Sequence, residues 1–391
     1  MQFLLVSLQR EWQRLRASRW DAAMVSWVPL LTMALMCWIF AAGQPYKLPI
    51  AVLNQDHSTL SRQLVRMLQA TPGLEVVQVA LNDAEATDAL QRMQVYGVVQ
   101  IPPHMERDVK RGGAVTISLL HNAQLATTSS LLQRDVQQVV GTLSAGIEMQ
   151  ARAKRGDPQQ VLQVRMEPVT TKLIALFNVS TNYEQFLAAT LIPALVHILA
   201  MTAGAWSVGR ELRDRSLGQW LQGGTRWWHT GAALVGKLAI PAASLWGCGM
   251  LCLLYLAVQR GWHVAGSMAW IGVGLWALVL VSLAAGAALA ALTMSLRTAL
   301  SGAGLLSAPA FAFSGVGFPL LAMGASARGW AMAMPYTHYA RLQLEQWQMG
   351  APVAQSVSVV GGLLLAACVL LALATAGLQR ARHLPQRWGG R

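Results

Sequence analysis

Long uncharged runs of apolar residues alternate with charged segments along this chain of 391 residues. A helix that crosses a membrane needs about 20 consecutive, mostly apolar residues. Six runs meet this requirement without any Asp, Glu, Lys or Arg, and they span Ala22–Ala42, Phe186–Val208, Leu238–Val258, Val264–Leu296, Thr298–Ala327 and Val353–Leu378. The pattern therefore predicts an α-helical integral membrane protein with six transmembrane helices.

The fifth run carries residues that break helices. Pro309, Gly315, Gly317 and Pro319 fall within about ten positions of one another. Irregular backbone at membrane depth is tolerated only where protein or water covers it. We therefore expect this run to cross once and then fold back, which gives a re-entrant outer segment over residues 315–350.

A polar insert, residues 43–183, separates the first and second runs. Short β-rich stretches (48–53, 74–79, 96–101 and 114–121) alternate with helical ones, a pattern typical of an α/β domain. Ser58 or Thr59 is expected to cap the first helix of the insert, and Asn82 the second. A long helix is predicted over 124–155, and residues 161–180 are expected to lead back to the membrane.

The distribution of Lys and Arg in short loops predicts the orientation. Fourteen such residues fall on one side of six alternating helices and three on the other. Both termini are therefore expected in the cytoplasm. The resulting domain map has an interface helix at 1–21, a first membrane helix at 22–42, the outer α/β domain at 43–183, five further membrane helices within 184–378 and a basic tail at 379–391.

The N-terminal segment predicts an amphipathic helix. Leu5, Leu8, Trp12 and Leu15 fall on one helical face, and the basic residues fall elsewhere. Such a helix is expected to lie along the inner leaflet.

The loop at residues 209–232, after the second membrane helix, combines charges with a short amphipathic stretch. Arg210, Glu211 and Arg213 precede Ser216, and Leu217, Trp220 and Leu221 follow. In the cytoplasm, this arrangement favours docking of a soluble partner, and the alternative is an ordinary solvated loop.

Composition changes the picture in one respect. The chain has a net charge of +13, which by itself allows nucleic-acid binding. Only 12% of its residues are charged, about half the usual share, which excludes an ordinary soluble enzyme. The insert is nearly neutral, so the excess positive charge lies mainly at helix ends and reports topology. We therefore expect no nucleic-acid partner.

Few residues in the membrane runs suggest chemistry. The stretch Gly231–Leu238 resembles a nucleotide-binding loop, but it ends in Leu where Mg²⁺ binding needs Ser or Thr. The four cysteines lie inside apolar runs and predict no metal site or disulfide framework. No catalytic residues and no bound cofactor are predicted. His197 and Glu345 are candidates for a translocation path, because ionisable groups inside membranes are commonly functional.

Four motifs, in this order, resemble the permease subunits of ABC type-2 exporters, in particular the Gram-negative drug-efflux branch with a large periplasmic insert. They are Asn54–Ser58; Leu176–Asn178; Arg210-Glu211 with Ser216-Leu217 and Gly236-Lys237; and Phe313-Ser314-Gly315 with Phe318-Pro319 and Met334–His338. Val179 and Gly324 stand where the family usually has Pro, and Ser216 where it usually has Thr. The resemblance covers nearly the whole chain.

The resemblance implies a mechanism. It implies a separate ABC ATPase subunit that binds ATP and Mg²⁺, a second permease as homodimer or paralogue, and in many cases a periplasmic adaptor with an outer-membrane channel. The ATPase-coupling residues would be Arg210, Glu211, Arg213, Ser216, Leu217, Trp220 and Leu221, and the outer gate would hold Phe313, Ser314, Gly315, Phe318, Pro319 and Pro335. An amphiphilic substrate, drug or lipid-like, would leave the bacterial inner membrane or the cytoplasm.

Three other classes remain open from the residues alone. A membrane-anchored receptor would use the insert to bind an external ligand, although five further helices exceed what a receptor needs. A lipid enzyme would need a polar catalytic set. A mechanical ABC permease would have four membrane helices rather than six.

Overall fold

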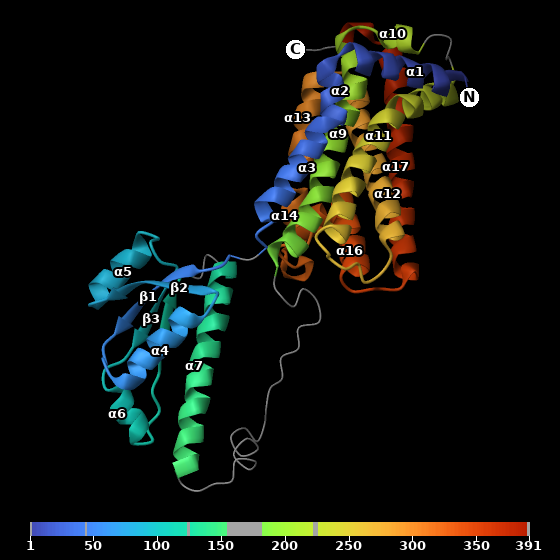
Figure 1. The fold of residues 1–391 in the computed structure, drawn as a ribbon. Helices are drawn as coiled ribbons and strands as arrows, with labels where there is room; N and C mark the ends of the chain where they lie inside the picture. Colours follow the sequence, from blue (N-terminus) through green and yellow to red (C-terminus); the bar gives the residue numbers. More distant parts are fainter. Residues whose placement is uncertain (1, 44, 123–125, 155–181, 222–225, 389–391) are drawn as a thin grey trace. The chain divides into compact units, whose positions relative to one another are not determined.

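The computed structural model describes residues 2–43, 45–122, 126–154, 182–221 and 226–388. The chain divides into a helical unit, Met1–Gly43 with Ala175–Arg391, and an α/β unit, Gln44–Ile174 (Figure 1). The motif at Leu176–Asn178, Val179 and the predicted return over 161–180 lie outside the described residues.

Long helices dominate the helical unit. In chain order they are α1 (Gln2–Ala17), α2 (Arg19–Val25), α3 (Trp27–Phe40), the π-helical turn η1 (Glu184–Ala188), α9 (Ala189–Arg213), α10 (Leu217–Trp220), α11 (Trp227–Val258), α12 (Met268–Thr293), α13 (Leu296–Ser307), α14 (Ala310–Phe313), α15 (Ala325–Ala333), α16 (Pro335–Trp347) and α17 (Val353–Arg382). Two 3₁₀ turns, Leu320–Ala322 and Pro385–Arg387, complete the set.

Four of these helical stretches are long and apolar enough to cross a membrane: η1 with α9, α11, α12 and α17. The α2–α3 pair would make a fifth, bent by 40°. The bend has a local cause, because Pro29 has no N–H to offer the carbonyl of Val25. The Ser244 hydroxyl of α11 donates to that carbonyl instead.

The prediction of six membrane helices is not confirmed. Residues 298–327 form no single helix: α13 ends at Ser307, and α14, a 3₁₀ turn and the start of α15 follow. Pro309 and Pro319 interrupt the hydrogen-bond ladder, and Gly315 has a φ of +87°, which disfavours side-chain-bearing residues. Within the described residues the structure therefore has four or five candidate crossings.

Helix α12 lies at the centre of the unit, where it packs against α9 and α17. Two glycines let α9 and α12 touch backbone to backbone. A Cβ added to Gly286 would lie 1.9 Å from the Met201 carbonyl oxygen, and one added to Gly204 would lie 2.1 Å from that of Leu283. Small residues at such crossings are the usual basis of helix association in membranes.

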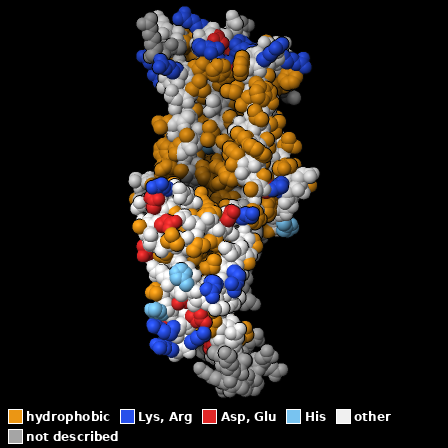
Figure 2. Space-filling view, turned by 60° about the vertical axis from the view of Figure 1, so that its left-hand side comes forward, with side chains coloured by type: hydrophobic (Ala, Val, Ile, Leu, Met, Phe, Trp, Pro, Cys, Tyr) orange, Lys and Arg blue, Asp and Glu red, His pale blue; other side chains and the backbone are white. Residues whose placement is uncertain are grey.

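Both termini, α1 and α10 lie at one end of the helical unit (Figure 1). Apolar side chains cover most of its visible surface, while Lys and Arg gather at the end with the termini (Figure 2). The exposed apolar residues include Leu31, Trp38, Leu251 and Leu365. This surface is typical of a protein surrounded by lipid.

The chain leaves the helical unit and returns to it at adjacent points. The backbone N–H of Tyr183 donates to the Gly43 carbonyl at 2.6 Å. Gly43 has a φ of +71°, and a Cβ on it would lie 2.3 Å from the Asn182 side-chain nitrogen.

The α/β unit holds a four-stranded sheet of order β2-β1-β3-β4. Its strands are β1 (Leu48–Asn54), β2 (Leu74–Ala80), β3 (Gly97–Ile101) and β4 (Ser118–His121); β1 pairs in parallel with β2 and β3, and β4 is antiparallel to β3. The helices are α4 (Thr59–Ala70), α5 (Asp83–Gln91), α6 (Met105–Lys110) and α7 (Ala126–Lys154).

Local sequence signals explain these elements. Ser58 and Asn82 cap α4 and α5, as predicted, since each side chain accepts a bond from the N–H three residues on. Helices α4 and α7 cover one face of the sheet around Ile50, and α5 covers the other around Leu53. The expected strands and the long helix after them are confirmed, although β4 begins at Ser118 rather than Ala114.

Candidate functional site

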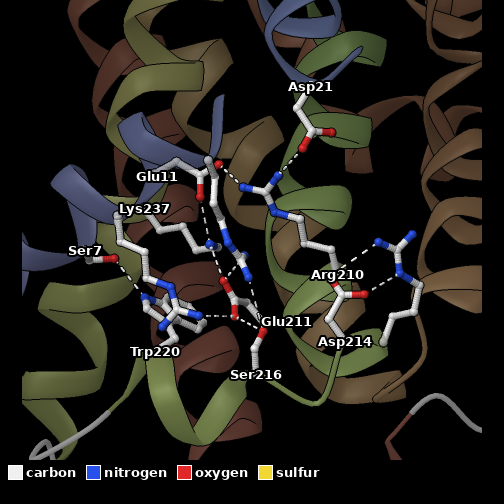
Figure 3. Close-up of polar contacts among 12 residues, drawn as sticks. Ser7, Glu11, Asp21, Arg210, Glu211, Asp214, Ser216, Trp220 and Lys237 are labelled. Carbon is white, nitrogen blue, oxygen red and sulfur yellow. Dashed lines mark hydrogen bonds and ion pairs between the residues drawn. The ribbon is translucent and has the colours of Figure 1, made fainter. Parts of the chain in front are cut away.

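Seven charged side chains form one network at the end of the helical unit that carries both termini (Figure 3). They come from α1, α2, α9 and α11 and are Arg10, Glu11, Arg14, Asp21, Arg210, Glu211 and Lys237. We call this set the charge network.

Arg210 lies between two carboxylates of the N-terminal helices. Its guanidinium bonds to Glu11, and it also donates to Asp21 Oδ2 at 2.7 Å. The Trp206 indole donates to the other oxygen of Asp21 at 3.0 Å. Arg210 therefore ties α9 to both α1 and α2.

Lys237 joins α11 to the same cluster. Its Nζ lies 2.8 Å from Glu11 Oε2 and 2.8 Å from Glu211 Oε1. The ammonium group also lies 4.9 Å from the centre of the Trp220 ring, within range of a cation–π contact. Gly231–Leu238 resembles a nucleotide-binding loop in sequence, but in the structure it is a continuous part of α11. Its lysine, Lys237, pairs with Glu11 and Glu211.

Glu211 also pairs with the two other cations of the charge network, Arg10 and Arg14. Arg14 and Arg10 both donate to its carboxylate, the latter at 3.2 Å, and the Ser216 hydroxyl donates to it as well. Arg14 also donates to Ser216 Oγ at 3.2 Å. Burial lowers the pKa of the Arg14 guanidinium, and the nearby Glu211 opposes that shift.

The centre of the network is shielded from solvent. The side chains of Glu11, Arg210, Glu211 and Lys237 are at most 4% exposed. Three carboxylates face four cations, so the charges nearly balance. Such a cluster adds little net stability compared with apolar packing, but loss of one partner is costly because it leaves a buried charge uncompensated.

Helix α1 packs on α11 with a polar face, which the sequence pattern missed. Ser7 and Glu11 are buried, and the Trp220 indole donates to Ser7 Oγ at 2.8 Å. A Cβ on Gly236 would lie 2.3 Å from the Leu4 carbonyl oxygen, so the two helices touch. Leu5 and Trp12, from the predicted apolar face, are about half exposed and free to face lipid.

The structure separates the predicted coupling residues into buried and exposed groups. Arg213 is half exposed and pairs with Asp214, whose pKa is lowered by that hydrogen bond. The six others are buried inside this chain: Arg210, Glu211, Ser216, Leu217, Trp220 and Leu221. Among the described residues of this loop before position 222, the exposed ones are Arg213, Asp214, Arg215, Gly218 and Gln219.

The predicted outer-gate residues lie in the broken segment after α13. Phe313 ends α14, and Ser314 is buried and donates to the Phe311 carbonyl at 2.6 Å. Phe318 is 52% exposed, and Pro319 precedes the 3₁₀ turn beside Gly315. Pro335 is the first residue of α16. The re-entrant course of residues 315–350 stays a prediction.

His197 and Glu345 have separate surroundings. The His197 ring is buried, with Nδ1 2.7 Å from Ser282 Oγ, and it stacks on Tyr336 at 6.5 Å. Glu345 pairs with Arg341 at 2.8 Å, as their spacing along one helix predicts. No contact between His197 and Glu345 is found among the described residues.

A second ion pair, unforeseen from the sequence, lies where the chain re-enters the helical unit; its carboxylate is buried and its arginine is 35% exposed. Glu184 accepts from Arg260 Nε with both oxygens at 2.9 Å and from the Trp262 indole at 2.9 Å. Arg260 also donates to the Ala41 carbonyl at 2.7 Å. The end of α3, η1 and the α11–α12 connection are thereby joined.

Glu184→Gln should lower the free energy of unfolding of the helical unit by about 3 kcal/mol, because Arg260 would stay partly buried without its anion. Thermal unfolding in detergent, followed by tryptophan fluorescence, measures this. Glu345→Gln is the matched control. Its partner Arg341 is 75% exposed, so its loss should cost less than about 1 kcal/mol. Equal effects of the two changes would contradict the structural role of Glu184.

Comparison with known proteins assigns the chain to a family. The sequence matches the ABC-2 family transporter protein over residues 20–376, and the chain belongs to that family. No curated protein matches it. The chain is therefore a multi-pass membrane component of an ABC transporter, and the family implies an ABC ATPase subunit as partner.

Proposed function

We propose that the chain is the permease subunit of an ATP-driven exporter that moves an amphiphilic substrate, drug or lipid-like, out of the cytoplasm or the inner membrane. A separate subunit binds ATP with Mg²⁺ and hydrolyses it. Two permeases pair, as a homodimer or with a paralogue, in the bacterial inner membrane. The observation that carries this proposal is the charge network, which joins α1, α2, α9 and α11 and to which the loop after α9 is bonded through Ser216.

The network gives the loop a rigid connection to the membrane helices. Ser216 donates to Glu211, and Trp220 donates to Ser7, so the loop is fixed to both α9 and α1. Displacement of the loop would therefore move α9, α1 and α11 together. In this proposal Arg210 and Glu211 are positioning residues, and Arg213, Asp214, Arg215 and Gln219 form the surface that meets the ATPase.

The orientation follows from the same end of the molecule. Both termini and α10 lie together (Figure 1), and Lys and Arg side chains gather at that end (Figure 2). The positive-inside tendency supports a cytoplasmic location for this end. The α/β unit then lies in the periplasm, where an adaptor with an outer-membrane channel would meet it. His197 and Glu345 are proposed for the path, and residues 315–350 for the outer gate.

The experiment is co-purification of the tagged chain with its co-expressed ABC ATPase. Arg215→Glu should reduce the ATPase recovered by about tenfold, because the exposed loop would repel an acidic partner surface. Arg341→Glu makes the same change on α16, toward the other end of the helical unit, and should leave recovery unchanged (Figure 1). Failure of the ATPase to co-purify with the wild-type chain, or equal recovery with both variants, would overturn the coupling surface.

Transport itself is measured with inside-out vesicles and a fluorescent amphiphilic dye, ethidium, as probe. ATP-dependent dye uptake is expected with the wild-type complex. Glu11→Gln should reduce ATP-driven uptake per amount of folded complex, because it weakens the link between loop and helices without touching the loop surface. The comparison is made per amount of complex recovered, since loss of this buried carboxylate also lowers stability. Uptake that is insensitive to Glu11→Gln would contradict transmission through the network.

A further inference from the structure

Strand β4 forms one edge of the described sheet in the α/β unit. Strand β4 pairs with β3 on one side, through registers such as Val99 with Leu119. In the strand order β2-β1-β3-β4 it is the last strand, with no neighbour on its other side among the described residues. The peptide N–H and C=O groups along such an edge are a template for pairing with another extended backbone.

A groove runs beside this edge. It has a volume of about 590 Å³, with β4 and the residue before it as one wall and α7 as the other. Ile117, Leu119 and His121 line the strand side at alternate positions, and Val136, Val140 and Gly141 line the helix side at helical spacing. The strand residues recur at every second position, and the helix residues about every 3.5 positions. One side of a pleated strand and one face of a helix therefore line the groove.

The lining of the groove is uncharged and only partly covered. Ile117, Leu119 and Val140 pack against the core but remain half-buried. A Cβ added to Gly141 would meet nothing within 4 Å among the described residues. Both nitrogens of the His121 ring form hydrogen bonds, with Ser129 at 2.6 Å and with Gln133 at 2.9 Å. These bonds hold the ring in one orientation at the side of the groove.

We propose that this groove binds an extended peptide segment of a partner protein, which adds to β4 as a fifth strand. The edge of β4 selects a peptide backbone, because only a backbone offers donors and acceptors at the spacing of a strand. The uncharged lining selects uncharged, apolar side chains at every second position of the segment. This inference does not depend on the transport function, since it concerns the α/β unit alone.

The probe is a fluorescent seven-residue peptide with Val at alternate positions and Thr or Lys between them, titrated into the full-length protein in lipid nanodiscs. Saturable binding is expected by fluorescence anisotropy. Bound peptide should also slow hydrogen exchange of the Ser118–His121 backbone amides. The same peptide with alternate N-methylated amides keeps its side chains but cannot complete the ladder, and it should bind at least about tenfold more weakly.

Two variants of α7 provide the matched test. Gly141→Leu fills the groove and should weaken peptide binding by about tenfold or more. Gly146→Leu makes the same change five residues further along the helix, also where a Cβ meets nothing within 4 Å, and should leave binding unchanged. Both variants should fold, because neither glycine is in close contact.

Four outcomes would overturn the proposal: no saturable binding, equal binding to both variants, equal binding of the N-methylated peptide, or no change in exchange at β4. A peptide-free dimer that Gly141→Leu alone dissociates, seen by mass photometry, would assign the edge to a second copy of this chain instead. None of these measurements uses ATP or the ATPase, so they are independent of the proposed function.

Discussion

Arg210→Gln is expected to destabilise the helical unit by about 3–5 kcal/mol, among the largest effects of any single change in the chain. The substitution removes the cation that lies between Glu11 and Asp21. Glu11 would keep Lys237 as a partner, but Asp21 would lose its ion pair. Chemical or thermal unfolding in detergent, followed by tryptophan fluorescence, measures the change.

Arg213→Gln is the internal control for this result. It lies three residues along the same helix, where its side chain is 50% exposed and pairs with the adjacent Asp214. Loss of this surface pair should change stability by less than about 1 kcal/mol. Similar losses for Arg210→Gln and Arg213→Gln would show that the charge network is not a closed, buried unit.

Gly286→Ala is the second change with a large expected effect. The added methyl group would lie 1.9 Å from the Met201 carbonyl oxygen, so α9 and α12 would have to separate. Backbone cannot move aside by changing rotamer, and we expect a loss of about 3 kcal/mol or more. A lower yield of monodisperse protein in size-exclusion chromatography should accompany a lower unfolding temperature.

Gly247→Ala tests whether the effect is one of close packing. Gly247 lies in α11, and a Cβ there would meet nothing within 4 Å. Because Ala favours helix more than Gly, this change should be neutral or stabilise by up to about 1 kcal/mol. If Gly286→Ala were equally harmless, the direct backbone contact between α9 and α12 would be wrong.

The α/β unit was predictable because its signals are local. Ser58 and Asn82 each cap a helix through a bond three residues away, and the alternating strands of the insert carry their own period. The broken course after α13 is also encoded locally, in Pro309, Gly315 and Pro319. The expected fold-back was assigned after a full membrane crossing, however, whereas α13 ends at Ser307, because the length of an apolar run does not show where its helix stops.

The charge network was not predictable in the same way. Its pairs join residues that lie 26 to 226 positions apart in the chain. Arg210 and Glu211 follow the apolar run and so resembled loop residues, yet α9 continues to Arg213 because partners from α1, α2 and α11 neutralise them. One signal was present: Glu11 is the lone carboxylate among residues 1–20 and lies one helical turn from Ser7 and from Leu15.

The hydrogen bond between Tyr183 and Gly43 has a consequence for how such a chain can change over evolution. Because the stem of the insert is closed within the helical unit, the distance between α3 and η1 does not depend on what lies between residues 43 and 183. Domains whose ends meet in this way can be inserted, exchanged or lengthened without disturbing their host. The membrane helices are thus a constant scaffold, and the α/β unit is a replaceable module through which related chains could acquire different partners.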